Sequence, residues 1–120
     1  MYLNAIASIM DDKISELHAE ICKTLGSPVR IEILNLLQDR EKTVGELAEG
    51  LELKQANVSQ HLAVLRQRQV VATRKEGTSI YYRVSNPKII QACKLMREVL
   101  IEQLKETQKL ASIAVRVRSE

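Results

Sequence analysis

The segment 55–67, QANVSQHLAVLRQ, constrains the fold most, because its two faces require different partners. At helical spacing Val58, Leu62 and Leu65 form an apolar stripe, joined by Ala56 and Ala63, which predicts one buried face. The other positions carry hydrogen-bonding side chains and no acid: Gln55, Asn57, Ser59, Gln60, His61 and Arg66. Such a face is either merely solvated or suited to contact base edges in a DNA major groove.

The flanking segments favour the second interpretation. Thr43-Val44-Gly45-Glu46 has the capping-box pattern, which predicts a short helix through about Glu49 that ends at Gly50. Residues 70–84 predict two strands around Glu76-Gly77-Thr78. A short helix, a turn, a polar-faced helix and a hairpin, in that order, are typical of a winged helix-turn-helix.

Two long amphipathic segments frame this motif. Residues 2–25 predict one helix, because apolar residues recur every three or four positions until Gly26-Ser27-Pro28 ends it and starts the next helix, which runs to about Gln38. A last helix begins at Ser85-Asn86-Pro87 and carries a seam of about three heptads. The predicted fold is therefore mainly α with a small β-hairpin wing. The first apolar stripe either packs on a partner subunit or the last helix, or belongs to a frayed tail.

Positive charge is concentrated around the polar-faced helix and the hairpin. Residues 54–84 carry six Lys or Arg against Glu76 alone, a balance of +5, whereas the whole chain has a net charge of +3. This pattern favours contact with phosphates over a solvated surface. No secretion signal or apolar membrane span is apparent, so we expect a cytoplasmic protein. No glycine-rich phosphate loop, His/Asp/Ser set or carboxylate pair indicates an enzyme.

Four motifs carry a family resemblance: LGSPVRIEIL at 25–34, TVGELAEGL at 43–51, NVSQHLAVLR at 57–66 and EGTSIYYRV at 76–84. Together they resemble the ArsR/SmtB family of metal- and stress-sensing transcriptional repressors. The match spans residues 19–100, so that 1–18 is an N-terminal helical extension and 101–120 a continuation of the last helix with a tail. The resemblance implies a homodimer of winged helix-turn-helix subunits, joined through the first and last helices, that binds an inverted-repeat operator in double-stranded DNA.

On this interpretation each polar side chain has an expected role. Asn57, Ser59, Gln60 and His61 face bases, whereas phosphates are contacted by Lys54, Gln55, Arg66, Arg74, Lys75 and Thr78. Tyr82 resembles the inward-facing tyrosine of the family. Two residues depart from the family pattern: Lys54 stands where a capping Ser, Thr or Asp is expected, and Gln69 replaces the usual glycine. The alternative is a winged-helix protein-interaction module without DNA contact.

The resemblance also implies a ligand that weakens DNA binding, but the commonest zinc-type sites of the family are missing. Residues 44–48 contain no cysteine, and no histidine follows His61. Cys22 and Cys93 remain, with His18 one turn before Cys22. The two thiols either fill space or form a sensor that becomes a disulfide, takes up a polysulfide bridge or binds a thiophilic ion such as arsenite. A weaker possibility is a metal site of His18, Cys22 and Cys93. Arg97, one turn beyond Cys93, predicts that Cys93 is the more reactive thiol.

Overall fold

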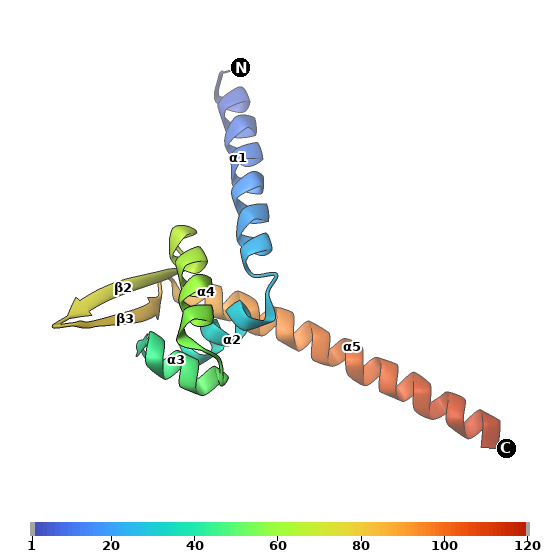
Figure 1. Ribbon diagram of the computed structural model, residues 1–120. Coiled ribbons are helices and arrows are strands. Elements are labelled where there is room, and N and C mark those ends of the chain that lie inside the picture. The colour runs from blue at the N-terminus through green and yellow to red at the C-terminus, as the bar shows by residue number, and fades with distance from the viewer. Residues whose placement is uncertain (1, 120) are drawn as a thin grey trace. The chain divides into compact units, whose positions relative to one another are not determined.

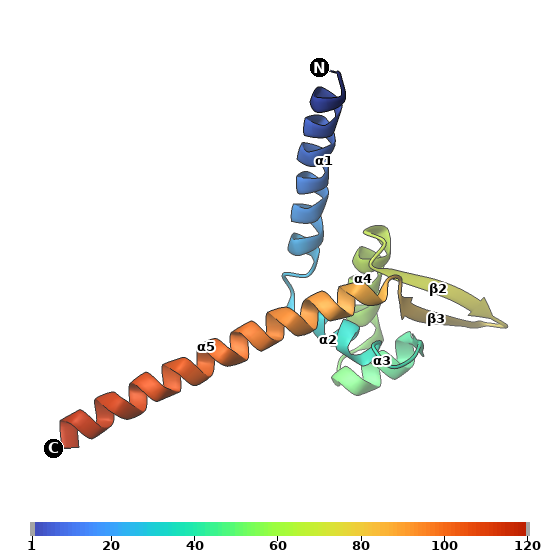
Figure 2. The ribbon, with the colours of Figure 1, turned by 180° about the vertical axis from the view of Figure 1, so that it is seen from behind.

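In a computed structural model that describes residues 2–119, five helices and three strands follow one another along the chain (Figures 1 and 2). Their order is α1 (Tyr2–Thr24), α2 (Pro28–Leu36), β1 (Lys42–Thr43), α3 (Val44–Leu51), α4 (Gln55–Gln67), β2 (Val71–Glu76), β3 (Ser79–Val84) and α5 (Pro87–Ser119). One compact unit extends to Pro87 and a second begins at Lys88. The expected class, mainly α with a small β wing, is confirmed.

Helix α2 begins as the sequence predicts. The Ser27 hydroxyl accepts a hydrogen bond from the backbone N–H of Arg30 at 3.5 Å, and Pro28 occupies the first turn. The helix ends at Leu36, two residues before the expected Gln38. Its most buried side chains, together with the residue that follows it, are Ile33, Leu34 and Leu37.

Helix α3 contains the predicted capping box but ends later than expected. The backbone N–H of Glu46 donates to Thr43 Oγ1 at 3.2 Å, and the backbone N–H of Thr43 donates to Glu46 Oε1 at 3.1 Å. The prediction that Gly50 ends the helix is wrong, because the left-handed residue that terminates it is Glu52, with φ 56°. Gly50 instead allows close packing on α2, since a Cβ there would lie 3.2 Å from Leu36 Cδ1.

Helix α4 has the predicted bounds, and Val58, Leu62 and Leu65 are fully buried on one face. Ala56 and Ala63 are exposed, so the predicted apolar stripe is narrower than expected. No side-chain hydrogen bond caps the helix at Lys54. After the helix Gln69 has a φ of 60°, the left-handed conformation that the family's glycine adopts readily and that costs another residue on the order of 1 kcal/mol.

The wing is a three-stranded antiparallel sheet in the order β1-β3-β2. Strands β2 and β3 pair from Val71 with Val84 to Glu76 with Ser79, and Gly77 at the tip has a φ of 61°. Strand β1 pairs Lys42 with Tyr82. The sequence predicted only the two hairpin strands, because a two-residue strand is too short to show alternation.

Helices α1 and α5 leave large apolar side chains uncovered. The exposed side chains of α1 are Leu3, Ile6, Ile9, Met10, Ile14 and Leu17, and those of α5 include Leu95, Met96, Leu100, Leu104 and Ile113. Residues 101–120 were expected to continue the last helix and end in a tail, and α5 extends to Ser119. Within residues 2–119, no helix is both long and apolar enough to span a bilayer.

Candidate nucleic-acid interface

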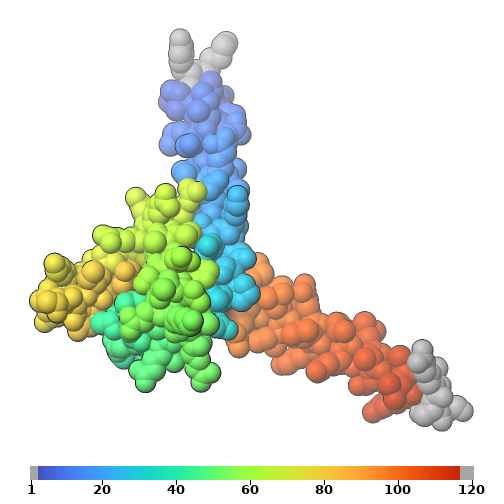
Figure 3. All heavy atoms as spheres, in the orientation of Figure 1, coloured from blue at the N-terminus to red at the C-terminus, as the bar shows by residue number. Residues whose placement is uncertain are grey.

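The surface of α4 presents most of the predicted DNA-contacting side chains to solvent. Lys54, Gln55, Asn57, Ser59, Gln60 and Arg66 are all exposed. In the space-filling view the side chains of α4 lie uncovered at the front of the molecule (Figure 3). Because the opposite face of α4 is anchored by three fully buried aliphatic side chains, this polar face is held on a rigid support.

His61 differs from the other members of this set. It is half-buried, and its Nδ1 accepts a hydrogen bond from Arg30 Nε at 3.2 Å. The same guanidinium donates through Nη1 to the backbone oxygen of Thr24 at 3.0 Å. Arg30 therefore links the last turn of α1 to α4, a role that its position in the sequence does not reveal.

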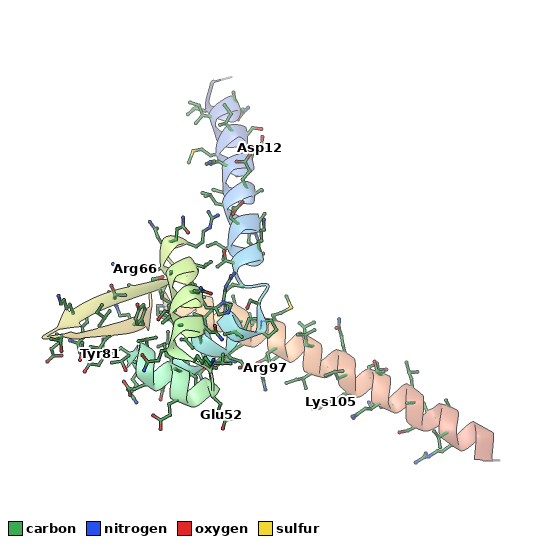
Figure 4. The ribbon with its side chains drawn as sticks, in the orientation of Figure 1. Asp12, Glu52, Arg66, Tyr81, Arg97 and Lys105 are labelled. Atoms are coloured by element: carbon green, nitrogen blue, oxygen red, sulfur yellow. The ribbon has the colours of Figure 1, made fainter. Side chains whose placement is uncertain are left out.

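An open groove of about 440 Å³ separates α4 from β3. Its lining comprises Ser59, Leu62, Ala63, Arg66, Gln67 and Tyr82. Arg66 projects from the C-terminal half of α4 on the side of the hairpin (Figure 4). Tyr82, predicted to be a core residue, is half-buried and borders this groove. The groove thus offers hydroxyl and guanidinium donors along one edge of the polar face of α4.

The two cations near the tip of the wing, Lys75 and Arg74, differ in their ion pairing. Lys75 and Thr78 are exposed near the tip. Arg74 is instead bound by two carboxylates: its Nε donates to Glu41 Oε1 at 2.7 Å, and its Nη1 to Glu76 Oε2 at 2.7 Å. Its guanidinium also lies 4.6 Å from the centre of the Tyr81 ring. The hydrogen bond from Arg74 lowers the pKa of the Glu41 carboxyl, and the Glu41 and Glu76 carboxylates raise the pKa of Arg74.

Pairing reduces the positive charge that this surface offers to DNA. Arg68 Nη2 lies 2.8 Å from Glu20 Oε2 on α1, so a second cation of the 54–84 segment is also compensated. In the described part of the chain no ion pair involves Lys54, Arg66 or Lys75. These three cations provide charge without an internal carboxylate partner.

The two cysteines lie in unequal surroundings. Cys22 is exposed and Cys93 is half-buried. Burial raises the pKa of the Cys93 thiol, so the expectation that Arg97 would favour its thiolate is wrong. His18 is exposed, and among residues 2–119 no group of three or more His, Cys, Asp or Glu side chains is arranged to hold a metal ion.

Fold and surface together define a DNA-binding transcriptional regulator of the winged helix-turn-helix class rather than an enzyme. Residues 27–73 match the family described as bacterial regulatory protein, arsR family. The HTH-type transcriptional regulator Rv0081 of Mycobacterium tuberculosis is 41% identical over 92 residues, which cover 76% of this chain and 81% of the relative. The chain belongs to the ArsR family.

Solved structures of relatives agree with this assignment. The crystal structure of Rv0081 aligns with a TM-score of 0.71, covering 78% of this chain and 94% of that one. The homodimeric winged helix-turn-helix DNA-binding domain of Mb0332 from Mycobacterium bovis, 27% identical, aligns with a TM-score of 0.73 over 80% of this chain and 89% of that one. The biofilm growth-associated repressor of Xylella fastidiosa is 34% identical over 88 residues, covering 73% and 77% of the two chains.

Proposed function

We propose that the protein is a homodimeric transcriptional repressor that binds an inverted-repeat operator. The observation that carries this proposal is the exposed, acid-free polar face of α4 beside the hairpin. In this docking mode the two α4 helices of a dimer enter successive major grooves about 34 Å apart. The name of the Xylella relative supports repression, and a repressor of bacterial genes acts in the cytoplasm.

The apolar faces of α1 and α5 support a homodimer. An apolar seam of this length is not stable in water alone, and on α5 Met96, Leu100 and Leu104 recur at four-residue spacing and are all exposed. The related domain of Mb0332 is homodimeric, which supports a dimer. We therefore assign these faces to the partner subunit.

The contacts with DNA divide according to exposure and charge. Asn57, Ser59, Gln60 and His61 face base edges, where amide and hydroxyl groups discriminate between base pairs. Phosphates are contacted by the remaining side chains of the proposed interface: Lys54, Gln55, Arg66, Lys75 and Thr78. Arg74 reaches a phosphate only if it leaves the carboxylates of Glu41 and Glu76.

We propose further that Cys22 and Cys93 report a redox, persulfide or thiophilic signal. They are the two cysteines of the chain, and the exposure of Cys22 makes it accessible to an oxidant. Cys22 lies between Glu20 and Thr24, the two residues through which α1 contacts Arg68 and Arg30. A signal that changes the packing of α1 in the dimer would therefore reach α4 through these contacts, provided that the two dimer states differ in operator affinity.

The accessible thiol is expected to react first. Thiolates rather than thiols are the nucleophiles, and burial holds Cys93 protonated to a higher pH than usual. Iodoacetamide at neutral pH should therefore alkylate Cys22 faster than Cys93, as measured by peptide mass spectrometry over time. Faster alkylation of Cys93 would contradict this assignment.

A second candidate is an ArsR-family regulator whose cysteines carry no signal. The raised pKa of Cys93 favours it, because a half-buried protonated thiol is a poor sensor. Such a regulator would bind the same operator as the same dimer, but its inducer would bind at a site other than the two cysteines.

One titration separates these possibilities. A fluorescent fragment of the gene's own upstream region is titrated with reduced protein, with protein oxidised by diamide, which accepts two electrons and two protons per disulfide formed, and with arsenite- or zinc-treated protein. Cys22→Ser and Cys93→Ser are the matched variants. Loss of binding after treatment in the wild type but not in the variants supports cysteine sensing. Unchanged binding in all samples supports the second candidate, and absence of binding at low salt contradicts the proposed function.

A further inference from the structure

We infer that Arg30 sets the hydrogen-bonding character of His61, so that His61 presents only a donor to DNA. This inference rests on the proposed role of α4 in contacting bases. It concerns one contact, between Arg30 Nε and His61 Nδ1 at 3.2 Å, which joins α2 to the helix that would enter the major groove.

The chemistry of the two side chains determines the direction of this bond. A guanidinium has five N–H donors and no acceptor, so Nδ1 of His61 must accept and carries no proton. An imidazolium, which bears hydrogen on both nitrogens, has no lone pair for Arg30. A ring that accepts this bond carries its one hydrogen on Nε2, the nitrogen that faces away from Arg30.

A second hydrogen bond, to the end of α1, holds the Arg30 side chain in place. Its Nη1 donates to the Thr24 backbone oxygen at 3.0 Å, and the Thr24 side chain is itself buried and donates to the Glu20 backbone oxygen at 2.8 Å. In the described residues no carboxylate forms an ion pair with Arg30, so nothing there competes with His61 for its guanidinium. Arg30 is thus a positioning residue behind α4.

The donor on Nε2 selects among bases. In the major groove guanine offers N7 and O6, adenine N7 and thymine O4 as acceptors, whereas cytosine N4 and adenine N6 are donors. His61 should donate to the acceptors of the first group and should form no hydrogen bond with the amino groups. Asn57, Ser59 and Gln60 can each donate and accept, so among the four proposed base-facing residues His61 is the donor-only one.

The test compares base preference and affinity in matched variants. Preferred sites of the full-length protein are selected from a random DNA library, and affinities are then measured by fluorescence anisotropy on the best site and on sites with single base-pair changes. At the base pair that His61 contacts, the wild type should discriminate by roughly 5- to 150-fold, the range of one good base contact. His61→Ala should abolish this preference, and His61→Gln should retain binding but also admit bases with amino groups.

Arg30→Met should weaken the preference at the base pair that His61 contacts and at no other base pair. In a protein that already carries His61→Ala, it should cause no further change in base preference. Arg68→Met is the matched control, because Arg68 also joins α4 to α1 but through Glu20 rather than His61. It should leave base preference unchanged. Additive effects of Arg30→Met and His61→Ala, or an equal loss by Arg30→Met on all sequences, would overturn the inference.

A measurement without DNA covers the case in which Arg30→Met does not fold. Nitrogen-15 NMR of the histidine rings should show His61 of the wild type with hydrogen on Nε2 and none on Nδ1 at pH 8. Hydrogen on Nδ1 would overturn the inference. Selection of no DNA sequence at all would instead contradict the proposed function, and with it the base contact of His61.

Discussion

In the proposed docking mode both α4 and the wing contact DNA, but their side chains differ in how free they are to do so. On α4 the polar side chains at positions 55, 57, 59 and 60 are exposed. In the wing, Arg74 is already bound by Glu41 and Glu76 and lies against Tyr81. The difference shows that a count of charges in the sequence overstates the attraction of residues 54–84 for phosphates, because Arg68 and Arg74, two of their six cations, have internal partners.

We therefore propose that α4 recognises the DNA sequence and that the wing adds a smaller, partly compensated electrostatic contribution. Neutral amide contacts to bases depend little on salt, whereas each phosphate contact adds to the salt dependence of binding. Variants of the two regions should therefore differ in which DNA they affect as well as in how much.

The largest effect is expected from Gln60→Ala on α4. Loss of a bidentate amide contact should weaken operator binding by roughly 5- to 150-fold and leave binding to unrelated DNA unchanged. Anisotropy titrations on both duplexes measure this. Ala63→Ser, at another exposed position of the same helix, is the control for changes in helix stability. Equal losses on both duplexes would assign Gln60 to the backbone instead.

A smaller, uniform effect is expected from Lys75→Gln in the wing. Removal of one phosphate contact should weaken binding to operator and unrelated DNA alike, and should reduce the slope of log affinity against log salt by about 1 per subunit. Titrations at four salt concentrations give the slope. An unchanged slope would show that Lys75 lies away from the DNA backbone.

Glu41→Gln should increase DNA affinity, in contrast to Lys75→Gln. It removes one of the two carboxylates that hold Arg74, so Arg74 is held less firmly and its contact with phosphate costs less; affinity for any DNA should rise by about two- to fivefold. Glu49→Gln, an exposed acidic position on α3, controls for the change in net charge. A similar rise in both variants would mean that the pair with Arg74 has no specific role.

Acidification should break the pair between Glu41 and Arg74 only at low pH. Arg74 lowers the pKa of Glu41 below its ordinary 4.5, so the pair is intact above that value and is lost only as the pH falls through the lowered pKa. DNA affinity in the range pH 6–8 should therefore show no step from Glu41. A step in that range that disappears in Glu41→Gln would contradict the assignment.

The smallest effect concerns the junction between the two regions. Gln69→Gly should stabilise the fold by about 1 kcal/mol, because Gln69 has a φ of 60° between α4 and β2. Thermal unfolding measures the change. The same substitution at Gln60, an exposed position inside α4, should destabilise by a similar amount. A lower stability of Gln69→Gly would show that the side chain of Gln69 compensates for its backbone.

The sequence predicted those features that depend on local pattern. The bounds of α4, the Ser27 cap and the capping box of Thr43 follow from spacing and cap chemistry within one segment. The structure corrected features that depend on contacts between segments. Gly50 serves packing against Leu36 rather than a helix end, and Arg74 is held by a residue 33 positions away.

The candidate site divides in the same way. Helical spacing alone placed the exposed face of α4, but not the contact between Arg30 and His61, which are 31 positions apart. The pKa of Cys93 depends on burial, which a neighbouring arginine in the sequence does not indicate. Pairings of this kind carry no periodic signal, so a single sequence cannot reveal them.

The most direct test of the central claim, that α4 recognises bases and charge alone does not account for binding, is a salt titration of the wild-type dimer on two duplexes. One carries the inverted repeat from the upstream region and the other a scrambled sequence of the same composition. We expect the inverted repeat to bind about 10³-fold or more tightly, and the ratio to persist as salt weakens both complexes. Equal affinities that fall together with salt would contradict the account, since only phosphate contacts would then remain.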